Sequence, residues 1–452
     1  MTQPQSARRI ALEVIRAVRE SDAYANLLLP VRLGRARLSD ADAGLATELT
    51  YGTLRMQGYY DAVIAIAAGR DVSQIDPPIL DVLRLASHQL LSMRVASHAA
   101  VDESVELAKT VGSRSAVGFT NGVLRTISRT DPDEWRERVL ARARSGEEAL
   151  ALEYSHPLWV TRAIRQVLVA EGREDELEAA LIADNVAPRV SLVALPGLSH
   201  RVELPGTPAQ YSPIGVRLDG GDPLRVPAVR EGRARVQDEG SQLAALALSR
   251  ARPIAEGEAW LDMCAGPGGK AALLAVEAAA GGATLVANEL VPARAELVRK
   301  ALAVVVPAPE VRVGDGTAIG AEHPDSFDRI LLDAPCTGLG ALRRRPEARW
   351  RKQPSDVAGL GVLQSALLRS AVAALKPGGV LAYVTCSPHA AETKAIIASV
   401  LRTAPGVERV NTHAVVQAIA SEPLDLPPGD HVQLWPHRHG TDAMFIQLLT
   451  KV

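Results

Sequence analysis

The stretch Leu261-Asp262-Met263-Cys264-Ala265-Gly266-Pro267-Gly268-Gly269-Lys270 has the pattern of a β-strand that ends in a glycine-rich turn and enters a helix. Glycines in such a turn let a ligand approach the backbone, and the start of the helix offers free N–H groups to an anionic group. The spacing matches neither G-x-x-x-x-G-K-[ST] nor G-x-G-x-x-G, so phosphate binding is not favoured. Taken alone, the turn is as consistent with a structural role as with ligand binding.

Around this turn, short apolar runs alternate with long Ala- and Leu-rich helical segments. The runs that we predict as strands are residues 259–263, 284–287, 311–313, 330–333 and 380–385. This alternation predicts a parallel, doubly wound α/β sheet that binds ligands beyond the carboxyl ends of its strands. We therefore predict a Rossmann-like domain over residues 236–452, with a first helix from Val236 to Leu248.

Acidic residues recur at the predicted strand ends. Glu289 ends the second strand, Asp315 follows the third within Gly314-Asp315-Gly316, and Asp333 ends the fourth. Carboxylates there suit a ligand with a ribose, an amine and a positive centre, such as S-adenosyl-L-methionine. Singly, Glu289 and Asp315 are equally consistent with a solvated carboxylate or a helix cap, and their joint placement favours the ligand site.

The three cysteines, Cys264, Cys336 and Cys386, also lie at predicted strand ends. A lone cysteine is usually a small buried apolar residue. Two cysteines at the mouth of one cleft, one of them in Asp333-Ala334-Pro335-Cys336, indicate nucleophilic chemistry instead. Zinc is not favoured because no C-x-x-C spacing exists, and His437-x-His439 has no third ligand nearby in the sequence. We expect no metal.

The amino-acid pattern of the chain changes at two places, which we take as domain boundaries. Residues 1–145 repeat apolar positions at helical spacing, with a helix start predicted at Pro77-Pro78 and a helix end at Gly112. Residues 146–235 carry Pro and Gly around β-rich pieces at 190–195 and 211–218, which predicts a small α+β, RRM-like linker domain. We thus predict three domains: 1–145, 146–235 and 236–452.

The charge and composition of the chain limit the kinds of binding partner that we expect. The formal net charge is -2, so a polyanion would need a local basic patch, and the one we predict to contact RNA comprises Arg343, Arg344, Arg345, Arg349, Arg351 and Lys352. A run of charges is more often a solvated face. No run of about 18 apolar residues is present, so we expect no membrane partner. Three cysteines in a long chain suit a reducing cytoplasm.

These motifs together resemble the RNA cytosine carbon-5 methyltransferases of the NOL/NOP/Sun class. The resemblance in the C-terminal half lies in residues 236–242, 264–270, 333–336 and 383–387. Residues 23–27, 46–52, 98–103 and 118–125 resemble the NusB-like domain of the RsmB (Sun/Fmu) subgroup, and residues 153–157 resemble the start of its middle domain. The resemblance implies an all-α NusB-like domain, a linker domain and a Rossmann-like class I methyltransferase domain.

The resemblance also implies an activity, which is methylation of carbon 5 of a cytosine in 16S ribosomal RNA. Cys386 would be the nucleophile that adds to carbon 6, Cys336 would assist release, and Asp333 would hold the edge of the ring. The implied ligands of S-adenosyl-L-methionine are Cys264, Ala265, Gly266, Pro267, Gly268, Gly269, Lys270, Glu289, Asp315 and Asp333, with Gln237 and Asp238 less directly involved. Lys270 would organise the carboxylates, Glu289 would bind the ribose and Asp315 the adenine.

Several alternatives stay open. Transfer RNA could be the substrate in place of ribosomal RNA. A DNA cytosine methyltransferase would use the Cys of its Pro-Cys pair as nucleophile and would not need Cys386. An amino-group methyltransferase would need an aromatic residue that Asp333-Ala334-Pro335-Cys336 lacks. A non-catalytic RNA-binding adapter would not need both thiols. We expect a monomer.

The sequence departs from the family pattern at three places. Glu289 stands where Asp is commoner, and Pro388-His389 follows Cys386-Ser387 where many members have aliphatic residues. The segment from Trp435 to Phe445 has His residues in place of the usual acids. None of these changes removes a reacting group.

Overall fold

The computed structural model describes residues 6–21 and 23–452, which form two compact units. One unit comprises Met1–Arg165, Asp175–Val186 and Leu342–Arg351; the other comprises Gln166–Glu174, Ala187–Ala341 and Lys352–Val452. The start of the predicted first domain, residues 1–5, lies outside the described residues. The borders predicted at 145 and 235 do not coincide with those of the units, and the division into three domains stays a prediction.

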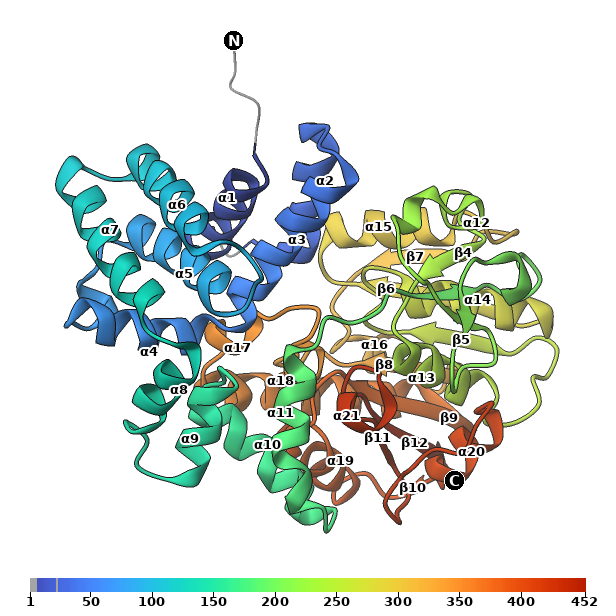
Figure 1. Ribbon diagram of the computed structural model, residues 1–452. Helices are drawn as coiled ribbons and strands as arrows, with labels where there is room; N and C mark the ends of the chain where they lie inside the picture. Colours follow the sequence, from blue (N-terminus) through green and yellow to red (C-terminus); the bar gives the residue numbers. More distant parts are fainter. Residues whose placement is uncertain (1–5, 22) are drawn as a thin grey trace. The chain divides into compact units, whose positions relative to one another are not determined.

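The first unit is helical (Figure 1, blue to teal). Its helices are α1 (Ala7–Glu20), α2 (Ala25–Ala36), α3 (Asp40–Arg55), α4 (Gln57–Ala68), α5 (Pro77–Leu91), α6 (Ser97–Val111), α7 (Arg114–Arg129), α8 (Pro132–Leu140), α9 (Gly146–Glu153), α11 (Leu177–Asn185), α17 (Ala348–Arg351) and the first part of α10 (Leu158–Ala170), with the 3-10 turns η1 (Val72–Gln74) and η2 (Glu174–Glu176). Helix α5 is the core helix, since most of its residues are buried and it contacts α1, α3, α4, α6 and α7. Its start at Pro77 and the end of α6 at Val111 confirm the predicted boundaries.

The second unit begins with a small antiparallel sheet. Its strands are β1 (Ser191–Ala194), β2 (Thr207–Pro208), β3 (Gly215–Arg217) and β4 (Ala234–Val236), in the order β2-β3-β1-β4, with η3 (Arg201–Glu203), η4 (Pro223–Arg225) and α12 (Pro227–Arg230) between them. Leu192, Ala194 and Val216 belong to one buried apolar cluster under this sheet. Both β-rich pieces predicted in this region therefore contain a strand.

The large sheet of the second unit has the order β10-β12-β9-β8-β5-β6-β7, with β11 paired to β12. The strands are β5 (Ala259–Asp262), β6 (Thr284–Glu289), β7 (Glu310–Val313), β8 (Phe327–Asp333), β9 (Leu375–Thr385), β10 (Val407–Arg409), β11 (Val432–Gln433) and β12 (Phe445–Lys451). All five predicted strands are present and parallel. The sheet as a whole is mixed, because β12 pairs antiparallel with β9 and carries β10 and β11.

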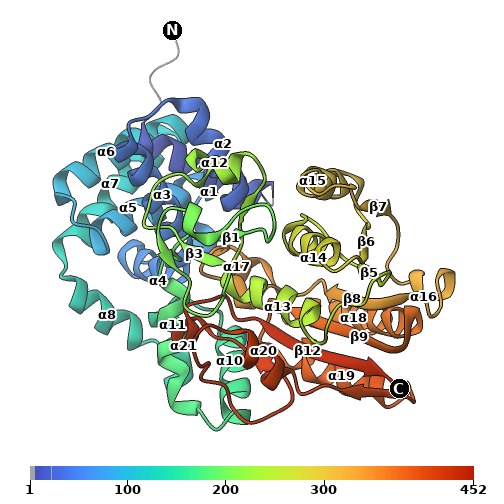
Figure 2. The same ribbon diagram turned by 90° about the vertical axis from the view of Figure 1, so that its right-hand side faces the viewer.

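Helices cover both faces of this sheet, as Figure 2 shows. One face is covered by α13 (Glu239–Ser249), α14 (Gly269–Ala280), α15 (Pro292–Leu302) and α20 (Thr412–Ile419), and the other by α16 (Ile319–Glu322), α18 (Pro354–Ala374) and α19 (Lys394–Leu401). Alternate side chains of β9 pack against the two helix layers. Val380, Ala382 and Val384 face the layer that contains α13 and α14, and Leu381 and Tyr383 face the layer that contains α18 and α19. A sheet buried on both faces explains the continuous apolar runs in the sequence.

Helices α13 and α18 both bear on predictions made from the sequence. The predicted helix at 236–248 begins at Glu239, because Val236 ends β4 and the Asp238 carboxylate caps the helix by accepting from the Gly240 N–H. Helix α18 is long and apolar enough to cross a membrane, but its buried side chains pack against β8 and β9, as in the core helix of a globular domain.

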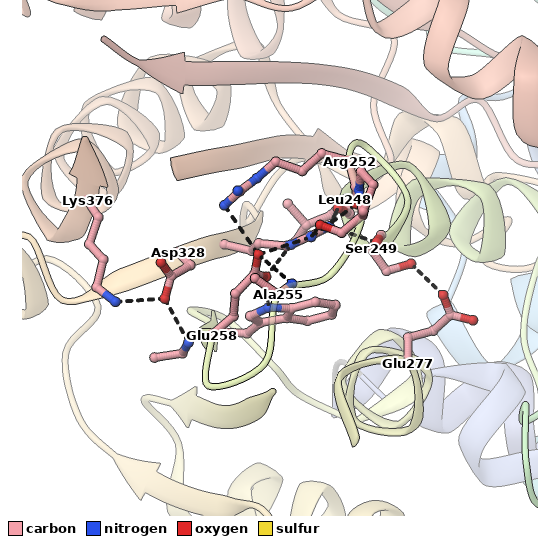
Figure 3. Close-up of polar contacts among 12 residues, drawn as sticks. Leu248, Ser249, Arg252, Ala255, Glu258, Glu277, Asp328 and Lys376 are labelled. Carbon is pink, nitrogen blue, oxygen red and sulfur yellow. Dashed lines mark hydrogen bonds and ion pairs between the residues drawn. The ribbon is translucent and has the colours of Figure 1, made fainter. Parts of the chain in front are cut away.

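A buried polar cluster closes the amino ends of the strands (Figure 3). Arg329, near the start of β8, is fully buried and donates to Glu258 at 2.7 Å and to the carbonyl oxygens of Leu248 and Ser249 at 3.1 and 2.7 Å. Its guanidinium also lies 4.8 Å from the Trp260 ring centroid. Because these contacts satisfy the last carbonyls of α13, they fix that helix on the sheet. The residues at the amino ends of β5 and β8 therefore make contacts that stabilise the fold.

Candidate active site

The opposite edge of the large sheet has the geometry of a ligand site. From β5 the chain proceeds to β6 and β7 on one side, and then returns to β8 and β9 on the other. Such a reversal leaves a crevice beyond the carboxyl ends of the two central strands, here β5 and β8. The glycine-rich turn follows β5, Asp333 ends β8, and Cys386 directly follows β9.

Cys336 and Cys386 face each other at this edge, with their sulfur atoms 3.5 Å apart. The structure therefore brings together two residues that are distant in the sequence, because β8 and β9 are parallel neighbours with Asp333 opposite Val384. The contact with Cys336, in which either thiol could be the donor, lowers the pKa of Cys386, and the nearby Lys270 ammonium acts in the same direction. The same contact, together with burial, raises the pKa of Cys336.

Lys270 and Asp333 form a half-buried ion pair next to the thiols. Lys270 Nζ donates to Asp333 Oδ2 at 2.8 Å, from the first turn of α14 to the end of β8. Burial opposes the charged form of Lys270, but the Asp333 carboxylate outweighs it and raises the pKa of the ammonium. Lys270 is therefore charged and positioned to organise the carboxylates rather than to accept a proton.

Asp262 is a site residue that sequence reasoning missed, although it directly precedes the glycine-rich turn. Its side chain is 1% exposed, and neither carboxyl oxygen has a partner of hydrogen-bonding geometry among the described residues. Burial, followed by repulsion from Asp333, raises its pKa to about 8. Gln237 is similar, because its buried side-chain amide has no hydrogen-bond partner in the described part of the chain and lies against Gly269. Both groups leave polar atoms for a ligand.

The glycine-rich turn leaves no room for side chains. A Cβ on Gly266 would lie 2.2 Å from Glu289 Oε2, and Gly268 has a φ of +102°, which favours glycine. The buried Glu289 carboxylate accepts from the Gly266 N–H and from the Val291 N–H, both at 3.0 Å. These two hydrogen bonds fix Glu289 against the turn. A carboxylate that binds a ligand hydroxyl at this position would need to be fixed in this way.

The other predicted cofactor residues have more varied surroundings. Burial raises the pKa of the Cys264 thiol, so this third cysteine is protonated at neutral pH. Asp315 is exposed, and its carboxylate accepts from the Thr317 N–H at 2.9 Å within the loop after β7; it does not cap α16, which begins at Ile319. Hydrogen bonds from Thr317 lower the pKa of Asp315, so it is ionised.

The predicted basic patch is not uniform, and its assignment to RNA is wrong for Arg349. Arg349 is fully buried, and its guanidinium donates to the carbonyl oxygens of Arg55 and Ser155 at 3.2 and 2.9 Å. It also donates to Asn185 Oδ1 at 2.9 Å. Burial lowers its pKa to about 10. Residues 342–351 therefore pack within the helical unit, where Arg349 satisfies buried backbone acceptors.

Two neighbouring arginines are also structural. Arg343 is 6% exposed, and Arg351 donates to the Val18 and Ala23 carbonyl oxygens at 2.6 and 2.5 Å. Arg345 is exposed, whereas Arg344 and Lys352 are half-buried. Only these last three keep the surface position that the sequence reasoning assumed.

His439 in the C-terminal segment is a structural residue. Its Nδ1 accepts from the Trp435 N–H at 2.9 Å, and its Nε2 donates to the Asp425 carbonyl oxygen at 3.1 Å. Burial lowers its pKa to about 4, so the ring is neutral. Among residues 6–21 and 23–452, no cluster of three or more His, Cys, Asp or Glu side chains could hold a metal ion.

Family models match both halves of the chain. Residues 251–450 match the model of the 16S rRNA methyltransferases RsmB/F, and residues 5–129 match the NusB family. The solved structure of PH0851 aligns with 100% of both chains at a TM-score of 0.82 and 23% identity, which shows a shared fold. Fold and site thus define the class as a Rossmann-like methyltransferase joined to a NusB-type helical domain.

Relatives extend the match to nearly the full length. "Putative methyltransferase Rv1407" of Mycobacterium tuberculosis is 48% identical over 99% of this chain and 96% of the relative. The "Probable ribosomal RNA small subunit methyltransferase B" of Bacillus subtilis is 30% identical over 99% of each chain. The ribosomal RNA small subunit methyltransferase B of Pseudomonas putida is 30% identical over 98% of each. The chain belongs to the RsmB/F family of 16S rRNA methyltransferases.

Proposed function

We propose that this protein transfers a methyl group from S-adenosyl-L-methionine to carbon 5 of a cytosine in 16S ribosomal RNA, through a covalent bond between Cys386 and carbon 6. One observation carries the proposal: two sulfurs lie 3.5 Å apart at the carboxyl ends of neighbouring strands, beside the half-buried Lys270–Asp333 ion pair. A methyltransferase acting on an amino group would have no use for two facing thiols.

The chemistry explains the need for both thiols. Carbon 5 of cytosine is a poor nucleophile, so a thiolate first adds to carbon 6 and makes carbon 5 enamine-like. Cys386 suits this attack because its pKa is lowered by the hydrogen bond from Cys336. Asp333 then hydrogen-bonds the ring edge and favours protonation of the ring nitrogen. The methyl transfer leaves S-adenosyl-L-homocysteine. A base then takes the proton from carbon 5, the electron pair of that C–H bond restores the double bond between carbons 5 and 6, and Cys386 leaves as the thiolate, with Cys336 assisting that release.

The residues beyond β5 and β6 fit the proposed cofactor. S-adenosyl-L-methionine would supply an electrophilic methyl group on a sulfonium centre. The unpartnered oxygens of Asp262 and the amide of Gln237 can accept or donate hydrogen bonds to its amino-acid part. Residues 264–270 bring backbone N–H groups at the start of α14 to the same place, and Glu289 can bind ribose hydroxyls. We assign the adenine to Asp315.

The names of the relatives support ribosomal RNA as the substrate. The target base has to be unstacked to reach the half-buried thiol pair, so a loop or a flipped nucleotide is the expected form. Arg344, Arg345 and Lys352 are our candidates for phosphate contacts, and Arg345 is the exposed one. We also propose that the protein is a monomer, that it works in the cytoplasm and that it needs no metal.

The deciding experiment compares substrates in one assay. Purified protein is incubated with methyl-labelled S-adenosyl-L-methionine and 16S ribosomal RNA, transfer RNA or DNA, and bisulfite sequencing then locates the product. We expect 5-methylcytosine in 16S RNA. Label in transfer RNA alone would show that transfer RNA is the substrate in place of 16S ribosomal RNA. Label in DNA alone would refute the RNA assignment. No transfer to any of the three would favour a non-catalytic RNA-binding adapter.

A further inference from the structure

Glu392 links the two loops that carry the reacting thiols. It ends the 3-10 helix η6 (Ala390–Glu392), and its side chain is fully buried. One carboxyl oxygen accepts from the Thr337 N–H at 2.8 Å. The other accepts from the hydroxyl groups of Thr337 at 2.5 Å and Ser387 at 2.6 Å. Because Thr337 follows Cys336 and Ser387 follows Cys386, one carboxylate holds both loops.

Two further contacts fix this carboxylate in the fold. Gln364 of α18 donates from Nε2 to Glu392 Oε1 at 3.3 Å and to the Pro335 carbonyl oxygen at 2.8 Å. The Tyr383 hydroxyl, from β9, donates to the Glu392 carbonyl oxygen at 2.8 Å. Glu392 is thereby tied to a helix and a strand as well as to both loops, so the sulfur separation depends on it.

The charge of Glu392 is not cancelled by these contacts, because all four donors to its carboxylate are neutral groups. Its effect falls on the Cys336 side of the pair. The pKa of Cys336 is raised first by the hydrogen bond with Cys386 and by burial, and the charges of Glu392 and Asp333 add to this. A buried carboxylate next to a thiol disfavours the thiolate.

The charges around Cys386 are different. Its pKa is lowered chiefly by the hydrogen bond from Cys336, against burial and against the negative charges of Asp333 and Asp442. The Lys270 ammonium, 2.8 Å from Asp333, also favours the Cys386 thiolate. Thus carboxylates act on both sulfurs, but the Lys270 ammonium acts on Cys386 and Glu392 acts on Cys336.

We propose that Glu392 is a positioning residue that holds the two cysteine loops together and keeps the proton of the pair on Cys336, which leaves Cys386 as the thiolate. This inference rests on the proposed function, in which Cys386 attacks and Cys336 assists release. It explains how two thiols in one pocket have different roles: the sulfur that must attack first is the one without the proton.

The test is the relative reactivity of the two cysteines, because the thiolate is the form that is alkylated. The full chain is treated with limiting iodoacetamide, without RNA or cofactor, and the label on each cysteine is measured by peptide mass spectrometry. In the wild-type protein we expect Cys386 to carry most of the label. Glu392→Gln keeps the shape and removes the charge, and we expect the Cys336-to-Cys386 ratio to rise about tenfold, which corresponds to one pKa unit.

Two control variants separate charge from packing. Glu277→Gln makes the same chemical change at another buried carboxylate of this unit, which accepts from the Ser249 hydroxyl at 3.0 Å (Figure 3), and should leave the ratio unchanged. Thr337→Val removes a neutral hydroxyl but keeps the charge of Glu392, and should leave the ratio within about twofold. An equal rise in Thr337→Val and Glu392→Gln would overturn the assignment to charge.

Other outcomes are equally decisive. An unchanged ratio in a Glu392→Gln protein that melts like the wild type would overturn the proposal. So would faster labelling of Cys336 than of Cys386 in the wild-type protein, a result that needs no variant to fold. Methyl transfer is measured separately: its absence from the wild-type protein would refute the proposed function, whereas the labelling ratio tests Glu392 alone.

Discussion

Lys270 Nζ lies 2.8 Å from Asp333 Oδ2 and joins the first helix after the glycine-rich turn to the end of the strand before the first reacting thiol. The pair is buried on the lysine side, with that side chain 12% exposed. It places a positive charge within reach of Cys386, whose neighbours Asp333 and Asp442 are negative. The balance of charge at the nucleophile therefore depends on this lysine.

We expect Lys270→Gln to shift the reactivity of Cys386 to higher pH. Without the ammonium, Asp333 opposes the Cys386 thiolate unchecked, so its pKa rises and less thiolate is present at neutral pH. A rise of one unit lowers alkylation and methyl transfer by at most about tenfold at pH 7. The rate of Cys386 alkylation, followed from pH 5 to 10, measures the shift. Lys270→Arg keeps the charge and should shift the profile less; identical profiles for Lys270→Gln and wild type would contradict this role.

Substitution of each thiol should give a different product. We expect Cys386→Ala to abolish methyl transfer, because no thiolate can add to carbon 6. We expect Cys336→Ala to accumulate a covalent protein–RNA adduct, because release is impaired. Denaturing gel electrophoresis with labelled RNA detects the adduct. If it forms in Cys386→Ala while Cys336 is intact, the two roles are reversed.

Asp262→Asn should reduce the pH dependence of stability. The folded-state pKa of Asp262 is about 8, above its usual value of 3.8, so between pH 4 and 8 the folded state holds a proton that the unfolded state has released. Stability therefore falls as pH rises through this window, by at most about 1.4 kcal/mol per pH unit from this group. Thermal unfolding at pH 5 and pH 8, without cofactor, should show a smaller difference in Tm for the Asn variant. Equal slopes would show that Asp262 titrates normally.

Arg345 and Arg349, four positions apart, should respond to substitution in different ways. Arg349→Met removes donors to the buried carbonyl oxygens of Arg55 and Ser155, and we expect a loss of about 3 kcal/mol in the free energy of unfolding. Arg345→Ala should leave stability near wild type but weaken RNA binding and reduce its dependence on the logarithm of salt concentration by about one. Denaturant unfolding and salt-dependent binding measure the two effects. A stable Arg349→Met protein with weakened RNA binding would reverse this division.

Much of the second unit could be predicted because its signals are local. The five parallel strands carry continuous apolar runs, since a sheet covered on both faces buries every residue. Gly266 in its tight turn and, in the first unit, Pro77 at a helix start also act locally, whereas the cap formed by the Asp238 side chain was not foreseen and moved the start of α13 to Glu239. Strand β12 was missed because it pairs antiparallel with β9 and no helix follows it to mark a repeat of the βα pattern.

The sequence by itself determined where the proposed reacting groups lie along the chain: Cys336 and Cys386 at strand ends, with Asp333 and Lys270 on neighbouring segments. Only the tertiary structure decided what each charged side chain contacts. It placed Glu392 against both thiol loops and buried Arg349 among carbonyl oxygens, and within residues 6–21 and 23–452 it gave the Asp262 carboxyl oxygens no partner of hydrogen-bonding geometry. Local sequence cannot settle these positions, because burial and ionisation depend on groups that the fold brings together from distant parts of the chain.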